Sequence, residues 1–207
     1  MKEKNFITFE GGECSGKTTV IAEIVKMFNE LNINYVSTRE PGGVKIAEDI
    51  RKVILNVENV GMEPECEALL YAAARMEHLN KKVIPALKEG KIVLCDRYLD
   101  SSIAYQGVAR GLGLDNILKI NSFALDHLPD LTIFIDVKPE VALKRLSLRD
   151  KTDRLDLETM DFHKKVYEGY HKVLEMYPDR IVRIDGNQSL EEVTKECVDK
   201  VLEYLGR

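Results

Sequence analysis

Residues 11–18 of the chain read Gly11-Gly12-Glu13-Cys14-Ser15-Gly16-Lys17-Thr18, and Thr19 follows them. The stretch matches the pattern G-x-x-x-x-G-K-[ST] in full, and it stands between the apolar run 6–10 and a run with helical periodicity. Glycines let a backbone wrap closely around a phosphate, so that loop amides and a helix amino terminus face the anion. We therefore expect residues 11–19 to hold nucleotide phosphates, with Lys17 reaching the β- and γ-phosphates and the Thr18 hydroxyl binding Mg²⁺.

Short apolar or β-branched runs alternate with helical patterns along the whole chain. The candidate strands are 6–10, 34–38, 92–96, 131–137 and 181–185. The candidate helices are 20–31, 45–55, 66–88, 115–125, 140–148, 161–176 and 190–205. Near-continuous apolar runs are typical of strands buried on both faces. The alternation predicts an α/β fold of the P-loop NTPase type, with a five-stranded, mainly parallel sheet flanked by helices, in a single domain over residues 1–207.

Polar residues follow three of the expected strands at the point where each strand ends. They are Glu10 with Gly11, Arg39 with Glu40, and Asp96 with Arg97. Ligands of parallel sheets lie at the carboxyl ends of the strands, so these residues point to one shared site. An apolar strand that ends in Asp beside a phosphate loop is a usual source of a carboxylate near the metal, so we expect Asp96 to help bind Mg²⁺. Arg97 would clamp a phosphate, and an ordinary surface arginine is the alternative.

Composition and charge exclude several classes of protein. The chain has 207 residues and a formal net charge of −5, which gives no general electrostatic attraction to a nucleic acid polymer. No apolar run approaches the roughly 20 residues of a membrane span, and the first residues pass directly into a strand-like run without the pattern of a signal peptide. The four cysteines are scattered, which is against a disulfide framework or a zinc site. We expect a protein of the cytoplasm that acts on small molecules.

Two further motifs make the chain similar to a known family. They are Thr38-Arg39-Glu40-Pro41-Gly42-Gly43, and Asp96-Arg97-Tyr98 continuing to Asp100-Ser101-Ser102 and Ala104-Tyr105-Gln106-Gly107. Together with the phosphate loop they resemble the thymidylate kinases, of the bacterial type with arginines in a lid, from Phe6 to near the carboxyl terminus. The resemblance implies Mg²⁺-dependent transfer of the ATP γ-phosphoryl group to dTMP, giving dTDP and ADP for dTTP biosynthesis. It also implies a homodimer.

The resemblance assigns an acceptor site to specific residues of this chain. Glu13 would receive the 3′-hydroxyl of dTMP, and Arg39 and Glu40 would line the floor of the site, in a turn shaped by Pro41. The acceptor phosphate would be held by Arg51 and Arg97, since arginine offers planar, bidentate donors to phosphate oxygens.

The base of dTMP would lie between the long helix and the segment after Asp96. Tyr71 and Arg75 are four residues apart and share a helix face. Tyr71 stands where the family often has Phe stacked on thymine, and Arg75 would donate to thymine O4, which cytosine replaces with an amino group. The resemblance implies edge contacts from Ser102 and Gln106 and a place for Tyr105 under the sugar. Ordinary helix packing is the alternative for Tyr71 and Arg75.

A charged stretch around residues 147–156 lies between the fourth strand and the next long helix. Taken alone it favours a solvated loop. The resemblance instead implies a lid at about residues 145–157 that closes over ATP, because a phosphate loop without Arg goes with lid arginines in this family. Arg149 or Arg154 would be the arginine finger, and Arg145 would pack against the adenine, which Asn187 and Gln188 would also meet.

The chemistry of the expected reaction is mainly electrostatic. The acceptor is already an anionic phosphate, so no strong general base is needed, and Lys17, Mg²⁺, Arg97 and the lid arginines would neutralise charge between the two nucleotides. Two other hypotheses stay open. A P-loop kinase for another nucleotide or a nucleoside would need a different acceptor pocket, against which residues 38–43 and 101–106 argue. A nucleotide-dependent switch would need a partner-binding insert, and no large insert is visible.

Overall fold

A computed structural model describes residues 5–148 and 153–207 of the chain. Its sheet has the strand order β2-β3-β1-β4-β5, and every strand pair is parallel. The strands are β1 (Phe6–Glu10), β2 (Tyr35–Arg39), β3 (Ile92–Asp96), β4 (Leu131–Asp136) and β5 (Ile181–Asp185). The prediction of a five-stranded parallel sheet is confirmed, with β2 displaced by one residue and β4 one residue shorter than expected.

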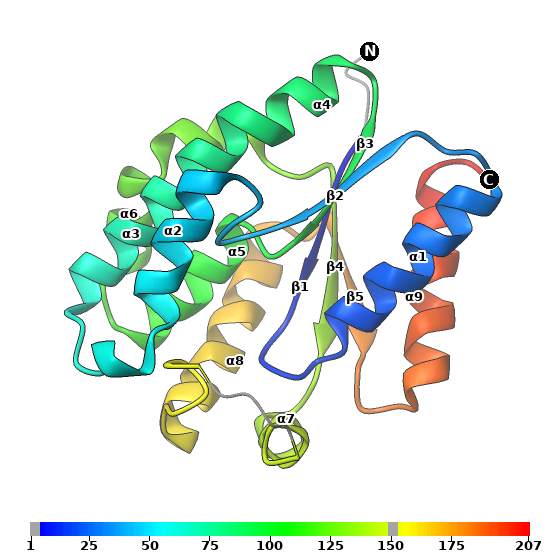
Figure 1. Ribbon diagram of the computed structural model, residues 1–207. Coiled ribbons are helices and arrows are strands. Elements are labelled where there is room, and N and C mark those ends of the chain that lie inside the picture. The colour runs from blue at the N-terminus through cyan, green and yellow to red at the C-terminus, as the bar shows by residue number, and fades with distance from the viewer. Residues whose placement is uncertain (1–4, 149–152) are drawn as a thin grey trace.

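Helices cover both faces of the sheet (Figure 1). One face carries α1 (Lys17–Glu30) and α9 (Leu190–Tyr204). The other layer contains α2 (Lys45–Leu55), α3 (Pro64–His78), α4 (Ile84–Lys88), α5 (Leu99–Ser102), α6 (Leu114–Ile120) and α8 (Met160–Met176). Among the described residues, no helix is long and apolar enough to cross a membrane.

The alternation of side chains along each strand divides the core into two clusters. In β1, Ile7 and Phe9 pack with α1 and α9, whereas Phe6 packs in the cluster under α3 and α8. In β3, Leu94 belongs to the first cluster, and Val93 belongs to the second. Both faces of the central strands are therefore apolar, which is the physical reason that these strands read as continuous apolar runs rather than alternating ones.

Three helical segments differ from the sequence expectation. The expected helix 115–125 ends as α6 at Ile120 and is followed by a 3-10 helix at Ser122–His127. The expected helix 66–88 consists of α3 and α4, which are joined by a π-helical turn at Leu79–Val83. The turn lies just before Pro85, which has no N–H to donate to the hydrogen bonds of an α-helix. Residues 99–109, for which we predicted no helix, form α5 and a second π-helical segment, Ile103–Ala109. Their polar and apolar side chains are both buried, so they carry no amphipathic period.

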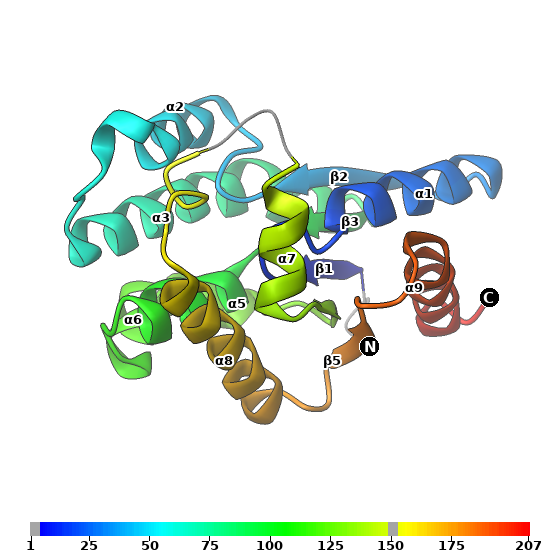
Figure 2. The ribbon, with the colours of Figure 1, turned by 90° about the horizontal axis from the view of Figure 1, so that it is seen from below.

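The carboxyl ends of the strands define one edge of the sheet. Figure 2 looks at this edge from below and shows α7 (Pro139–Leu146) lying in front of it, between α8 and the pair α1 and α9. At this edge the Arg97 amide donates to Phe9 O at 2.9 Å, and the Glu40 amide donates to Asp96 O at 2.9 Å. These bonds hold the ends of β1, β2 and β3 together, as expected for a shared site.

Candidate active site

The loop after β1 has the form of a phosphate cradle. Gly11 has a φ of +145°, and a Cβ there would lie 2.6 Å from Ile135 O, so only glycine fits at this position. Gly16, with a φ of +96°, leads into α1, whose amino terminus has no side-chain cap. No N-cap side chain therefore competes for the first amides of α1, which suits a helix amino terminus that binds an anion, as the motif predicts.

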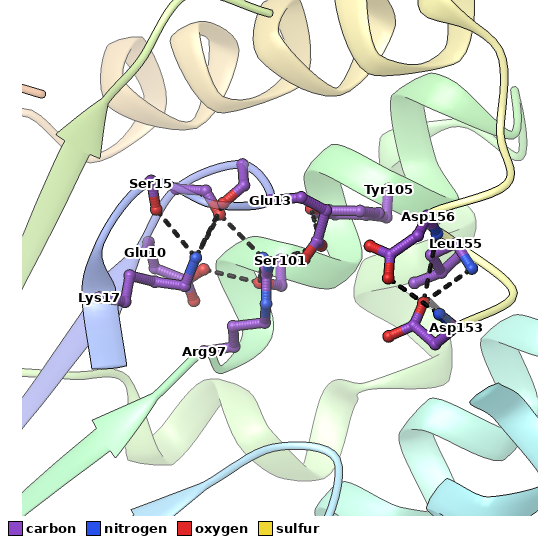
Figure 3. A network of polar contacts seen from close by, with 12 residues as sticks. Glu10, Glu13, Ser15, Lys17, Arg97, Ser101, Tyr105, Asp153, Leu155 and Asp156 are labelled. Carbon is purple, nitrogen blue, oxygen red and sulfur yellow. Dashed lines mark hydrogen bonds and ion pairs between the residues drawn. The ribbon is translucent and has the colours of Figure 1, made fainter. Parts of the chain in front are cut away.

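Lys17 folds back over this loop (Figure 3). Its Nζ donates to Gly11 O at 3.0 Å, Gly12 O at 2.9 Å and Ser15 Oγ at 3.0 Å, and the residue is only 7% exposed. Burial and the nearby charge of Arg97 lower the pKa of Lys17 to about 8, against the opposing effect of three carboxylates. A phosphate oxygen would be a stronger partner for this ammonium group than the carbonyls that it now contacts.

Arg97 lies against the phosphate loop rather than on the surface. Its Nη1 donates to Gly11 O at 2.9 Å and to Tyr170 Oη at 3.0 Å. Its Nη2 donates to Glu13 Oε1 at 2.6 Å (Figure 3). Tyr105 donates to the same oxygen of Glu13 at 2.8 Å. Burial alone would raise the pKa of Glu13, but the charges of Arg97 and Lys17 outweigh it and lower the pKa to about 2. Glu13 is therefore an anion, and Arg97 is held in place by it.

A buried carboxylate, Glu10, lies beneath Arg97. It accepts from the Tyr98 amide at 2.7 Å, from Ser101 Oγ at 2.6 Å and from Tyr170 Oη at 3.0 Å. Ser101 and Tyr170 in turn accept from Arg97 Nη1, at 3.4 and 3.0 Å. Sequence reasoning placed Glu10 at the edge of the sheet without a role, and it did not identify Tyr170, which lies 73 residues beyond Arg97 in the chain.

Thr18 and Asp96 line one cavity at the ends of β2 and β3, together with Thr38 and Arg39. Asp96 Oδ1 is buried and has no hydrogen-bond partner among residues 5–148 and 153–207. Such an oxygen fits a metal that Thr18 and nucleotide phosphates also ligate, because Mg²⁺ takes few protein ligands and keeps several waters. The described residues hold no group of three or more His, Cys, Asp or Glu that could bind a metal by themselves. A metal here would depend on the bound nucleotide.

A second cavity brings together five of the eleven predicted acceptor residues. It is lined by Glu13, Tyr71, Arg97, Ser101, Tyr105, Gln106 and Leu155. Two residues predicted for the base lie apart from this lining. Ser102 Oγ is buried and has no hydrogen-bond partner in the described part of the chain. Arg75 is 1% exposed and donates to Glu40 at 2.8 Å, to Asn121, and to Tyr98 O at 3.1 Å. Its contact with thymine O4 stays a prediction.

The residues predicted for the floor and for the acceptor phosphate take two different positions. Arg39 is exposed, and its Nη2 donates to both carboxylate oxygens of Glu48, each at 2.9 Å. Glu40 is buried between Arg75 and His78, whose Nδ1 lies 2.9 Å from its Oε1. Pro41, joined to Glu40 by a cis peptide bond, accepts at its carbonyl from Arg51 Nη1 at 2.9 Å. The carboxylate of Glu40 thus faces α3, whereas Arg51 contacts the turn that follows Glu40.

A third cavity lies on the other side of the phosphate loop. It is lined by Cys14, Ser15, Gly16, Thr19, Arg145, Gly186, Gln188, Leu190 and Val193. Arg145 donates to Gly186 O at 3.1 Å and Cys14 O at 3.4 Å, so this arginine connects α7 with the phosphate loop. Asn187 is turned away, and its Nδ2 donates to Asp185 Oδ1 at 2.7 Å. Arg145 and Gln188 are therefore brought together as predicted, and Asn187 supports the turn.

The two arginines predicted as fingers have different outcomes. Arg149 lies outside the described residues. Arg154 is 3% exposed and donates to Ile54 O at 2.7 Å and to Glu67 Oε2 at 2.6 Å. It is held between α2 and α3 in this arrangement and does not lie at the phosphate loop, so its role as a finger stays a prediction. Sequence reasoning missed Glu67, although its place four residues before Tyr71 puts both on one helix face.

The fold and these cavities together define a class of protein. The phosphate loop lies at the carboxyl edge of a parallel sheet, with a cavity on each side and with Lys17 and Arg97 between the cavities. This is the arrangement of a P-loop phosphotransferase that acts on two small substrates. A family model described as thymidylate kinase matches residues 9–197. The chain belongs to the thymidylate kinase family, and therefore to the nucleoside monophosphate kinases.

Individual relatives agree with this assignment over nearly the whole chain. The thymidylate kinase of Clostridium novyi is 56% identical over 95% of this chain and 97% of the relative. That of Ligilactobacillus salivarius is 52% identical over 98% of this chain and 100% of the relative. The crystal structure of the thymidylate kinase from Ehrlichia chaffeensis, at 34% identity, superposes with a TM-score of 0.79 and covers 97% of this chain.

Proposed function

We propose that the protein transfers the γ-phosphoryl group of ATP to dTMP, giving dTDP and ADP. The observation that carries the proposal is the position of Arg97 and Glu13 between the phosphate loop and the cavity of Tyr71, Tyr105 and Gln106. One guanidinium group therefore reaches the phosphate loop and the acceptor side, which is what a transfer between two bound anions requires.

On the donor side, ATP would lie with its phosphates in the loop and its adenine in the cavity of Arg145 and Gln188. Lys17 would leave the loop carbonyls for the β- and γ-phosphate oxygens. When bound at Thr18 and Asp96, Mg²⁺ would supply positive charge to the same phosphates.

On the acceptor side, dTMP would enter the cavity lined by Tyr71, Tyr105 and Gln106. Glu13, held as an anion, would accept from the 3′-hydroxyl, and Arg97 would contact the phosphate of dTMP. Because that phosphate is itself the nucleophile, these residues bind and orient the two substrates and stabilise charge, and no residue needs to act as a strong base.

The resemblance to the family extends the proposal to the setting of the reaction. We expect a homodimer in the cytoplasm that serves dTTP biosynthesis. Sedimentation of the purified protein would test the dimer, since the monomer has 207 residues and a mass of 23.6 kDa.

A panel of acceptors tests the proposed reaction. Purified protein with ATP and Mg²⁺ is offered dTMP, dUMP, dCMP, UMP and AMP, and ADP formation is followed. We expect kcat/KM to be highest for dTMP, lower for dUMP and lowest for the other three. A preference for AMP or UMP would overturn the thymidylate assignment and leave a kinase. Hydrolysis of ATP that no acceptor accelerates would instead favour a nucleotide-dependent switch.

A further inference from the structure

A carboxylate that the proposed reaction does not use lies at the centre of the acceptor half. Glu67 on α3 is 0% exposed. Its Oε1 accepts from Gln106 Nε2 at 2.8 Å and Arg110 Nε at 3.3 Å. Its Oε2 accepts from Arg110 Nη2 at 3.0 Å and Arg154 Nη2 at 2.6 Å. Donors from three residues, on two segments of the chain, therefore saturate this carboxylate.

The charge of Glu67 follows from these contacts. Burial alone would raise its pKa, but hydrogen bonds from Arg110, Gln106 and Arg154 and the charge of Arg110 outweigh burial and lower the pKa. A buried carboxylate with two guanidinium partners is ionised, and an ionised carboxylate can only accept hydrogen bonds.

An acceptor-only partner settles the orientation of the Gln106 side chain. An amide has a donating and an accepting end, and the two are often interchangeable in a structure. Here the Gln106 amino group must face Glu67, because its carbonyl would meet a carboxylate oxygen at 2.8 Å. The carbonyl Oε1 is thus directed away from Glu67, and Gln106 is one of the residues that line the acceptor cavity.

A fixed carbonyl in a buried cavity distinguishes between pyrimidines. Thymine and uracil carry an N3–H that donates to it, whereas the N3 of cytosine presents a lone pair that repels it. We propose that Glu67 is a positioning residue. By fixing the amide of Gln106, it makes the site select pyrimidine bases that carry an N3–H donor. The proposal rests on the proposed function, because it deepens the base recognition of the same site.

The structure also gives the reason that this task falls to Gln106 rather than to Arg75 alone. Each of the three guanidinium nitrogens of Arg75 already donates to a protein oxygen, on Glu40, Asn121 or Tyr98. Among the described residues, the side chain of Gln106 makes one hydrogen bond of this kind, with Glu67. A residue that recognises a base needs one end of its amide held by the protein and the other end available to the base. The contact of Gln106 with Glu67 has this form.

The test compares Glu67→Gln with a matched control in the same network. Glu158 accepts from Arg110 Nη2 at 2.6 Å and has no contact with Gln106 among the hydrogen bonds of the described residues, so Glu158→Gln removes a charge of equal size beside the same arginine. For each protein, kcat and KM are measured for dTMP, dUMP and dCMP, and KM is also measured for ATP. The stability of each protein is followed by thermal unfolding.

We expect Glu67→Gln to lower the ratio of kcat/KM for dTMP to that for dCMP by about tenfold or more, since a glutamine partner can face either end of the Gln106 amide. The change should appear in KM for the pyrimidine nucleotides, with KM for ATP unchanged. Glu158→Gln should keep the wild-type ratio. A folded Glu67→Gln protein whose ratio stays within about twofold of wild type would overturn the proposal, as would an equal change in the control.

A second variant decides the question if Glu67→Gln does not fold. Gln106→Met removes the carbonyl at nearly constant shape, and it should lower the same ratio by a similar factor. An unchanged ratio in Gln106→Met would refute the proposal, because Glu67 cannot act through a group that does not read the base. Failure of the proposed function is a separate result, since it would appear as wild-type protein that does not use dTMP.

Discussion

The donor half and the acceptor half of this site are built in different ways. The donor half is a contiguous loop whose backbone conformation, fixed by glycines such as Gly11 and Gly16, creates the phosphate cradle. The acceptor half is a set of buried ion pairs between segments far apart in the chain, of which Arg75 with Glu40 and Arg154 with Glu67 are examples. A backbone-built site can be recognised in a short motif, whereas a side-chain-built site depends on pairings that no short motif contains.

This difference predicts different consequences of mutation. A side chain of the donor half contributes to the reaction and little to the fold, because the loop holds its shape through the backbone. A charged side chain of the acceptor half contributes to the fold, because its partner is left as an uncompensated buried charge when it is removed. Two substitutions test the contrast directly, and a third tests the place where the halves meet.

Lys17→Ala should give the largest effect, a loss of about a thousandfold in kcat, as expected for a positioned charge lost from the transition state. The free energy of unfolding should change by about 1 kcal/mol or less, since only three hydrogen bonds to the loop are removed and a buried charge is removed with them. Steady-state kinetics and urea unfolding check both parts.

The control for Lys17→Ala is Lys26→Ala on the same helix. Lys26 is exposed, and its one ion pair with another described residue is that with Glu23 at 3.8 Å. It should leave turnover unchanged. A Lys17→Ala enzyme with turnover within about tenfold of wild type would show that the lysine of the motif is not the main phosphate ligand.

Glu40→Ala should show the opposite behaviour, with a loss of about 3–5 kcal/mol in the free energy of unfolding. The substitution leaves the guanidinium of Arg75, which is 1% exposed, without the partner of its Nε, and it also removes the acceptor of His78 Nδ1. Urea unfolding of the variant beside Glu23→Ala measures the effect, because the exposed pair of Glu23 contributes about 1 kcal/mol at most.

A small effect of Glu40→Ala would break the comparison. If the variant unfolded within about 1 kcal/mol of wild type, the buried pairs of the acceptor half would not hold it together. The acceptor half would then resemble the donor half, with side chains that act on substrates and a backbone that keeps its shape without them.

The same contrast explains what could be predicted from the sequence. The strands were identified because burial on both faces leaves apolar runs, and the phosphate loop was identified because its backbone conformation requires glycine at positions such as Gly11 and Gly16. Residues 99–109 were not recognised as helical, since Asp100, Ser101 and Gln106 are buried beside apolar neighbours and no amphipathic period remains. Helix type is set there by tertiary contacts.

The acceptor residues were partly predicted, and only through family motifs. Glu13, Arg97, Tyr105 and Gln106 come together in one cavity as expected. The groups that hold them were missed. Glu67 lies 39 residues before Gln106 and 87 before Arg154, and nothing local to a glutamate reveals partners at such separations.

Glu10, which lies beneath Arg97 where the two halves meet, gives the smallest predicted effect, and this effect depends on pH. Burial, together with the negative charge of Asp100, raises the pKa of Glu10 from 4.5 to about 7. In the unfolded chain this carboxyl loses its proton near pH 4.5, whereas the native protein keeps it until about pH 7. The native state binds the extra proton between these values, so the contribution of Glu10 to stability falls as pH rises through this window.

Glu10→Gln removes this ionisation and keeps a polar group beside Ser101 and Tyr170. The free energy of unfolding of the variant, relative to wild type, should therefore increase by about 2 kcal/mol between pH 5 and pH 7.5. Urea unfolding at intervals across this range measures the difference, and Glu23→Gln, at an exposed position, should give a flat line. A difference that is flat or falls for Glu10→Gln would mean that the carboxylate is already ionised at pH 5. The charge of Arg97, which is separated from Glu10 by the Ser101 hydroxyl, would then outweigh burial. Glu10 would in that case be an ion-paired carboxylate like those of the acceptor half.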